Sequence, residues 1–245
     1  MKSSAVCVAA LASLCLQHAV AGPADYVYTP TVEYGERELD FKFGTAKEPG
    51  EDRASAASLG LGLGVTPYWF TEVYAKFNRV GGDATKLDAV EWENKFQLTE
   101  TGEYPVDVGL VVELERPQDH AEGWEVKFGP LFQADLTQKV QANLNLLFER
   151  HFDAEEDSKT ELGYQWQLKY RWKPEIEFGA QGFGEVGEWN DWESSDEQSH
   201  KAGPAVFGKL PIGDHQAIKY NAAYLVGLSD HAPDHTLRMQ VEYEF

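Results

Sequence analysis

Apolar and polar residues alternate with a period of two along most of this chain, in stretches of about ten residues each. In the last stretch every second residue is apolar, and the set is Leu237, Met239, Val241, Tyr243 and Phe245. Because successive side chains of a strand point to opposite faces, the pattern predicts strands with one apolar and one polar face. A repeated series of such strands is typical of a transmembrane β-barrel, with lipid outside and a polar lumen inside.

The alternation therefore predicts an all-β fold, a single antiparallel transmembrane barrel of about 12 strands, with 10 to 14 as the expected range. The expected strands are 36–46, 55–66, 69–80, 89–99, 105–116, 123–135, 139–152, 160–172, 175–187, 200–210, 215–228 and 235–245. Short turns, expected on the periplasmic side, lie near Pro67, Gly102, Thr137, Pro174 and Gly213. Longer acidic loops, expected outside, are 47–54, 80–88, 117–122, 153–159, 188–199 and 229–234.

The N-terminus has the features of a cleavable signal peptide. Lys2 supplies a positive start, residues 5–16 are apolar, and small residues allow a cut after Ala21. The predicted domains are thus a signal peptide at 1–21, a segment at 22–34 and the barrel at 35–245. Residues 22–34 are either a periplasmic segment or an extension of the first strand. Both cysteines, Cys7 and Cys15, fall in the signal, so the mature chain has no thiol to form a disulfide or a cluster.

Charge and hydropathy narrow the function classes. The net charge of −20 argues against nucleic acid as a partner, because phosphate binding needs a basic surface. Outside the signal, no uncharged apolar run approaches the roughly 20 residues of a spanning helix. The expected location is the outer membrane of a Gram-negative bacterium, and no cofactor is expected.

The inward positions of the predicted strands are unusually rich in charge. The lumen-lining candidates are Glu38, Asp40, Lys42, Glu72, Lys76, Glu91, Glu93, Lys95, Asp107, Glu113, Glu125, Lys127, Glu149, Lys169, Arg171, Glu177, Glu185, Lys209, Lys219 and Arg238. A barrel of this size has either a narrow pore or a filled polar core. The first alternative is a porin-like or transporter-like conduit for small polar or cationic solutes. The second is a non-conducting structural or surface-binding barrel with acidic cation-binding loops.

The sequence also contains residue types suited to metal binding and to catalysis. Asp230, His231, Asp234 and His235 form the densest group of metal-ligating residue types, although a solvated turn is the alternative interpretation. An enzyme at the barrel rim is less favoured, because no sequence feature fixes a nucleophile beside a base such as His151. No catalytic residue is predicted.

Gly-Pro pairs interrupt two of the predicted strands, at Pro130 and Pro204. Proline lacks the backbone donor of a strand and is usually kept to strand edges, ends or bulges. We therefore expect a bulge or a local bend at each position.

The C-terminal third, through Gly203-Pro204, residues 220–228 and residues 236–245, resembles a family of proteobacterial outer-membrane barrels. These are the largely uncharacterised exported proteins similar to meta-pathway, transporter-like barrels. The resemblance implies outer-membrane location and the passage of small molecules, without a transferable catalytic residue. The expected partners are outer-membrane lipid and lipopolysaccharide. The terminal strand ending at Phe245 is similar to the signal that barrel-insertion machinery reads. The oligomeric state stays open.

Overall fold

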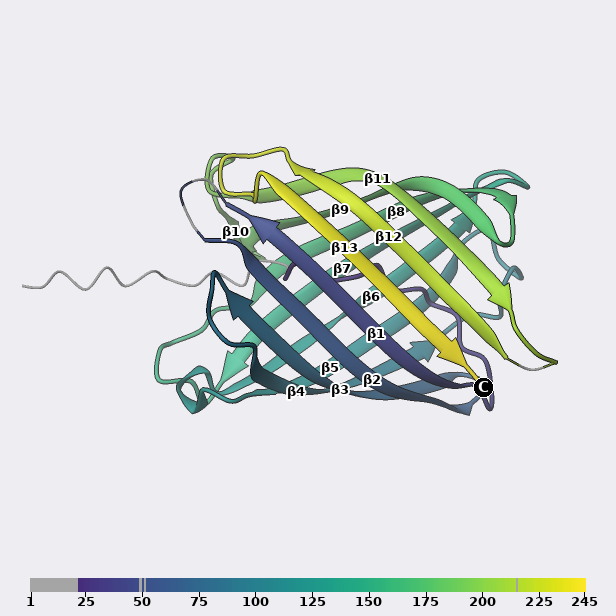
Figure 1. Cartoon of the computed structure of the whole chain (residues 1–245), viewed down its shortest axis with the longest axis horizontal. Coiled ribbons are helices and arrows are strands. Elements are labelled where there is room, and N and C mark those ends of the chain that lie inside the picture. The colour runs from purple at the N-terminus through teal and green to yellow at the C-terminus, as the bar shows by residue number, and fades with distance from the viewer. Residues whose placement is uncertain (1–21, 49, 51, 215) are drawn as a thin grey trace, which may run out of the picture.

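The computed structural model describes residues 22–48, 50, 52–214 and 216–245, and its strands close into one antiparallel barrel (Figure 1). The predicted signal peptide, 1–21, lies outside the described residues. The strands are β1 (Arg37–Lys47), β2 (Ala54–Thr66), β3 (Trp69–Val80), β4 (Lys86–Gln97), β5 (Asp107–Pro117), β6 (Trp124–Asp135), β7 (Val140–Phe152), β8 (Glu161–Lys173), β9 (Ile176–Glu188), β10 (Asp191–Trp192), β11 (Ser199–Pro211), β12 (Ala217–Gly227) and β13 (His235–Glu244).

Each long strand pairs with its neighbours in the sequence, and the ring closes where β13 pairs with β1. The closing register runs from Glu38 opposite Glu244 to Lys47 opposite His235. The two-residue β10 pairs only with β9 and stays outside the ring. The described strands thus form the expected 12-strand barrel, and the all-β prediction is confirmed.

The two faces of the barrel wall differ as the alternation predicts. Along β1 the side chains of Glu38, Asp40 and Lys42 are buried, whereas Leu39 and Phe41 are exposed on the outer face. Exposed apolar side chains cover the outside of the wall generally, as on β2, where Leu61 is 64% exposed. An apolar exterior around a polar interior is suited to lipid on the outside of the wall.

The connections differ in length at the two ends of the barrel. We call one end the loop end; its connections are residues 48–53, 81–85, 118–123, 153–160, 189–198 and 228–234. The other, the turn end, carries Phe245 and tight connections such as 67–68 and 174–175 (Figure 1). One predicted short turn is wrong in length, because the connection around Gly102 spans residues 98–106. Within this connection the Asp107 carboxylate accepts a hydrogen bond from the Gly102 backbone amide at 2.7 Å.

Helix is nearly absent from the described residues, which include a single 3-10 turn at η1 (His120–Glu122) in a loop. No helix in this part of the chain has the length and apolar character needed to span a bilayer.

Of the bulge or local bend that we expected at each Gly-Pro pair, the bulge is not formed. The register of β6 on β7 is the same before and after Pro130, from Phe128 opposite Phe148 to Leu131 opposite Asn145. The register of β11 on β12 is likewise unchanged across Pro204. The missing proline donor therefore leaves a short gap in the pairing on one side of each strand without inserting a residue.

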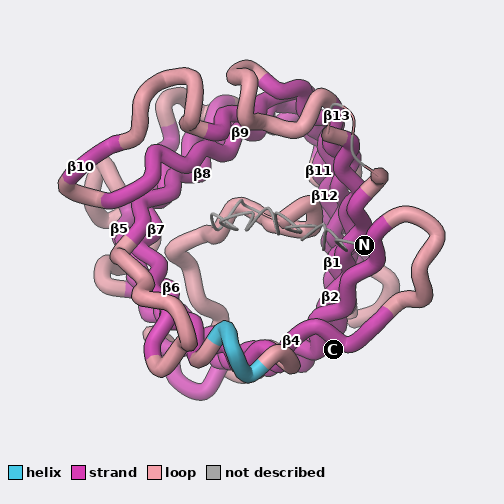
Figure 2. Tube along the Cα trace, turned by 90° about the vertical axis from the view of Figure 1, so that its left-hand side faces the viewer, coloured by secondary structure: helices cyan, strands magenta, loops and turns pink. Residues whose placement is uncertain are grey.

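Residues 22–36 form an irregular coil inside the barrel, which we call the luminal segment. Figure 2, viewed along the barrel from its loop end, shows coil within the ring of strands. Pro23 lies against the backbone of Gly44 near the loop end, and the Gly35 amide donates to Gly64 at the turn end. The segment is thus neither a periplasmic tail nor an extension of β1, the two alternatives that the sequence suggested.

Candidate functional site

The luminal segment divides the interior of the barrel, and polar side chains of the wall hold it in place. Tyr26 donates its hydroxyl to Glu93 at 2.5 Å, and Tyr28 donates to Glu113. The side-chain amide of Asn145 donates to the Tyr28 carbonyl at 3.1 Å. These contacts reach across to β4, β5 and β7, so the segment is fixed to several strands at once.

Apolar residues on the inner face pack against the same segment. Tyr28 joins Val111, Leu131 and Leu147 in one buried cluster. Val27 joins a second, whose other members are Phe183, Ala205, Phe207, Ala223 and Leu225. Burial of apolar side chains on both sides of the coil adds a hydrophobic contribution to its polar contacts.

A lysine lies between the segment and the wall. The ammonium of Lys42 is 3.5 Å from the centre of the Tyr26 ring and 3.6 Å from that of Tyr74. It also lies 3.5 Å from Asp40, which accepts from the Tyr74 hydroxyl at 2.8 Å. A cation between two aromatic faces and a carboxylate is stabilised without water, which explains how Lys42 is buried.

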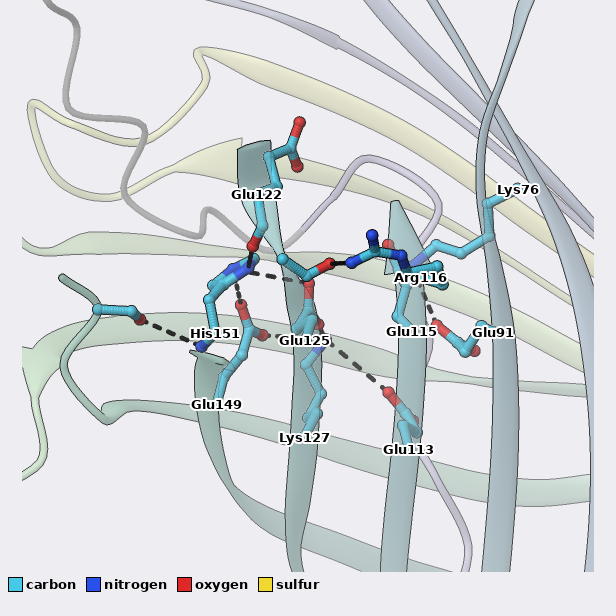
Figure 3. Close-up of polar contacts among 12 residues, drawn as sticks. Lys76, Glu91, Glu113, Glu115, Arg116, Glu122, Glu125, Lys127, Glu149 and His151 are labelled. Carbon is cyan, nitrogen blue, oxygen red and sulfur yellow. Dashed lines mark hydrogen bonds and ion pairs between the residues drawn. The ribbon is translucent and has the colours of Figure 1, made fainter. Parts of the chain in front are cut away.

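Two lysines connect the acidic side chains of the wall between β3 and β7 (Figure 3). Lys76 pairs with Glu91 at 3.0 Å and with Glu115 at 2.5 Å. Lys127 lies near three carboxylates, those of Glu113 (3.8 Å), Glu125 (3.3 Å) and Glu149 (3.1 Å). Each lysine thus compensates more than one carboxylate in a partly dry interior, where unpaired charge is costly.

A separate ion-pair group lies at the turn end. Lys219 pairs with Glu36 at 3.0 Å, with Glu242 at 3.8 Å and with Glu244. Lys209 pairs with Glu244 at 2.7 Å. Glu36 precedes β1, and burial raises its pKa above the ordinary value, while the neighbouring Lys219 opposes the rise.

A polar cavity of about 480 Å³ occupies the lumen beside the luminal segment. It reaches from Pro174 at the turn end to Asp40 and Tyr74 in the middle of the barrel. Its acidic lining is Glu33, Glu36, Glu38, Asp40, Glu72, Glu93, Glu177 and Glu242. Its basic lining is Lys95, Lys169, Arg171, Lys209 and Lys219.

The charges of this cavity are distributed unevenly around the ring. Glu38, Asp40, Glu72 and Glu93 come from β1, β3 and β4, whereas the basic residues other than Lys95 come from β8, β11 and β12. Three further acids lie among these bases: Lys219 pairs with Glu36 and Glu242, and Lys169 pairs with Glu177 at 3.5 Å. The lining as a whole thus has more acidic than basic side chains.

The structure places the predicted lumen candidates on the inner side of the wall. The buried ones are Glu38, Asp40, Lys42, Glu72, Glu91, Glu93, Asp107, Glu113 and Arg238. Partly exposed ones are Lys76, Lys95, Glu125, Lys127, Glu149, Lys169, Arg171, Glu177, Glu185 and Lys219. Lys209 differs, because it is exposed at the turn end. The candidates therefore belong to several groups along the lumen and do not form one site.

Asp230, His231, Asp234 and His235, all in the described part of the chain, do not bring three ligand atoms together. Among the described residues, ligand atoms come within 4.8 Å of one another in two other groups of three. His235 instead contacts Tyr224, with its Nδ1 at 2.9 Å from the tyrosine hydroxyl. The Ser158 hydroxyl accepts a hydrogen bond from the backbone amide of His151 at 3.1 Å.

Sequence reasoning missed Tyr26 and Tyr28, because the luminal segment lacks the alternation of a strand. A signal that could have revealed the luminal segment is the occurrence of apolar residues at inward positions of the strands. Val111, Leu131 and Leu147 would face water in an empty lumen, and all three pack with Tyr28. An apolar inner face in an otherwise charged lumen thus indicates that something covers it.

Comparison with protein-family models gives no match for this chain, and comparison with curated proteins gives none either. Solved structures share its architecture. One is the COG4313 outer membrane channel from Pseudomonas putida F1, with a TM-score of 0.58 and 13% identity, covering 90% of this chain and 98% of that one. The NanC porin has a TM-score of 0.53 and 13% identity, covering 84% of this chain and 98% of its own.

The KdgM porin, solved in complex with disordered oligogalacturonate, has a TM-score of 0.53 and 7% identity, and covers 85% of this chain and 98% of that chain. At such identities the likeness concerns the fold, which is that of outer-membrane porins and channels. The architecture agrees with the predicted location in the outer membrane of a Gram-negative bacterium.

Proposed function

We propose that this chain is a porin-like or transporter-like conduit of the outer membrane, which passes small polar solutes and favours cations. The observation that carries the proposal is the cavity of about 480 Å³ with a charged lining. A lumen filled only for stability would leave little free volume. Eight acidic residues line the cavity against five basic ones, and this excess favours cations.

The luminal segment sets the size of the conduit in this proposal. It lines the cavity with Tyr26, Val27, Tyr28, Thr29 and Thr31. Solutes therefore pass beside the segment, or the segment shifts to let them through. The resemblance to meta-pathway, transporter-like barrels fits a conduit for small molecules.

We also infer how the barrel meets its membrane partners. The outer-face belt, which includes Leu39, Phe41 and Leu61, contacts lipid, and the acidic loop end meets lipopolysaccharide through bridging cations. The terminal strand is read by the barrel-insertion machinery, because the Phe245 ring stays half exposed and stacks on Tyr243 at 5.5 Å.

Solute flux into liposomes tests the conduit. We expect liposomes that contain the refolded protein to swell in small polar solutes faster than empty liposomes, and most clearly for cationic ones. Glu38→Lys, which replaces one of the acidic residues that line the cavity, should slow the uptake of cations relative to that of neutral solutes. Glu156→Lys is the matched control, because Glu156 lies exposed in a loop at the loop end. Flux no greater than that of empty liposomes would favour the non-conducting structural barrel instead.

A further inference from the structure

Three ligand atoms of different side chains converge on the inner face at the loop end. Glu125 is on β6, and Glu149 and His151 are on the paired strand β7, with Glu125 opposite His151 in the register. His151 Nε2 lies 3.9 Å from Glu125 Oε2 and 4.0 Å from Glu149 Oε1. All three ligand atoms are within 4.8 Å of one another. Figure 3 shows the three side chains turned toward one another.

The imidazole of His151 is oriented by a group outside this triad. Its Nδ1 lies 3.0 Å from the backbone carbonyl oxygen of Glu122. A carbonyl only accepts, so Nδ1 carries the proton and donates, and in the neutral ring Nε2 then presents its lone pair to the two carboxylates. A lone pair facing two anions is unfavourable, and either a proton on Nε2 or a metal ion between the three atoms relieves it. Metal-bound histidines usually donate their other nitrogen to such a carbonyl or carboxylate.

Lys127 holds the two carboxylates by their other oxygens. It contacts Glu125 Oε1 at 3.3 Å and Glu149 Oε2 at 3.1 Å, whereas Oε2 of Glu125 and Oε1 of Glu149 face His151. The lysine thus positions both ligands without occupying the space between them. Separations near 4 Å exceed a hydrogen bond and are about half an ångström wider than the roughly 3.4 Å between tetrahedral ligands bound at about 2.0 to 2.2 Å, so a small closure of the side chains would bring them onto one ion.

The second group of three ligands, Glu91, Glu93 and Glu113, lacks these properties. It contains no imidazole. Glu91 accepts a hydrogen bond from Lys76, Glu93 accepts one from Tyr26, and Glu113 accepts one from Tyr28. Its charges are thus used to hold the lumen together. Of the two groups, only the one with His151 has a nitrogen lone pair, on Nε2, that is available to bind a metal ion.

We propose that Glu125, Glu149 and His151 form a binding site for a divalent transition-metal ion of the Zn²⁺ class at the outer mouth of the barrel. Imidazole with carboxylate oxygens suits Zn²⁺, Ni²⁺ or Cu²⁺, whereas Ca²⁺ and Mg²⁺ prefer oxygen alone. Three protein ligands leave a coordination position for water or for a donor atom of a solute. The His151 side chain is 26% exposed, so an ion arriving at the loop end has access. The proposal does not depend on whether the barrel conducts.

Zn²⁺ titration of the full-length protein tests the site. The protein is refolded in detergent without a polyhistidine tag, and binding is followed by calorimetry or by competition with a chromogenic chelator. We expect one ion per chain at micromolar or tighter affinity, weaker at acidic pH because a protonated imidazole has no lone pair. His151→Ala should weaken binding by about 100-fold, since even loss of an outer-shell partner costs 10 to 100-fold. Glu149→Gln should weaken it by about 10-fold or more.

His235→Ala is the matched control, because His235 is also at the loop end but contacts Tyr224. Heat-modifiable gel mobility verifies that each variant forms the barrel. In a second measurement, the electron paramagnetic resonance spectrum of bound Cu²⁺ should show coupling to a single nitrogen, which His151→Ala removes. No binding at 100-fold excess of micromolar Zn²⁺, or equal binding by wild type and His151→Ala, would overturn the proposal. Failure of the conduit would leave this binding unchanged.

Discussion

Tyr28 contributes both a polar and an apolar contact to the docking of the luminal segment. Its hydroxyl donates to Glu113, its carbonyl accepts from Asn145, and its ring packs against Val111 and Leu131. A buried hydrogen bond to a carboxylate contributes roughly 1.5 to 3 kcal/mol. Phenylalanine would keep the packing of the ring and lose only the hydroxyl.

We therefore expect Tyr28→Phe to increase the fraction of molecules whose luminal segment is displaced by about tenfold or more. Hydrogen exchange of the peptide covering residues 22–36 measures this fraction through the loss of amide protection. Tyr170→Phe is the control, because Tyr170 is exposed on β8. Equal protection in wild type and Tyr28→Phe would mean that the Tyr28 hydroxyl does not hold the segment.

The strands and the luminal segment differ in how far the sequence predicts them. The two faces of β1 follow from alternation alone, because Leu39 and Asp40 must point to opposite sides of the wall. The luminal segment has no period, and its partners, such as Glu113, lie 85 positions away from Tyr28. Such contacts depend on the closed ring and are not encoded by local propensity. The absence of a bulge at Pro130 also depends on the neighbouring strand, because the residues on both sides of Pro130 keep one register with β7.

Two glycines of the wall make room for the luminal segment. A Cβ atom at Gly44 would overlap the backbone of Pro23, and one at Gly64 would overlap that of Glu33. Neither backbone can give way as a flexible side chain would. Small residues at these positions are thus required by the close approach of two backbones.

We expect Gly44→Ala to form the barrel and to displace the start of the luminal segment. Channels of this variant should then have a larger conductance than those of wild type, because the segment narrows the lumen. Gly82→Ala, in a loop with open space around the glycine, should leave the conductance unchanged. A smaller conductance in Gly44→Ala than in wild type would contradict the conclusion that the luminal segment narrows the lumen.

At the scale of the whole molecule, an apolar exterior encloses a charged interior that is partly filled and partly open. The fold and its inward charges follow from the sequence, since each strand repeats the same alternation. The distribution of acids and bases around the cavity does not, because it depends on which strands meet in the closed ring. The site at His151 also needed the structure, since its ligands come from two strands.

The conductance of single molecules in a planar bilayer, recorded across a KCl gradient, shows whether the barrel conducts and which ions it prefers. A conduit with an acidic excess should give discrete current steps and a reversal potential on the side that indicates preference for K⁺ over Cl⁻. A bilayer that stays sealed at all voltages, with the barrel shown to be inserted, would contradict it.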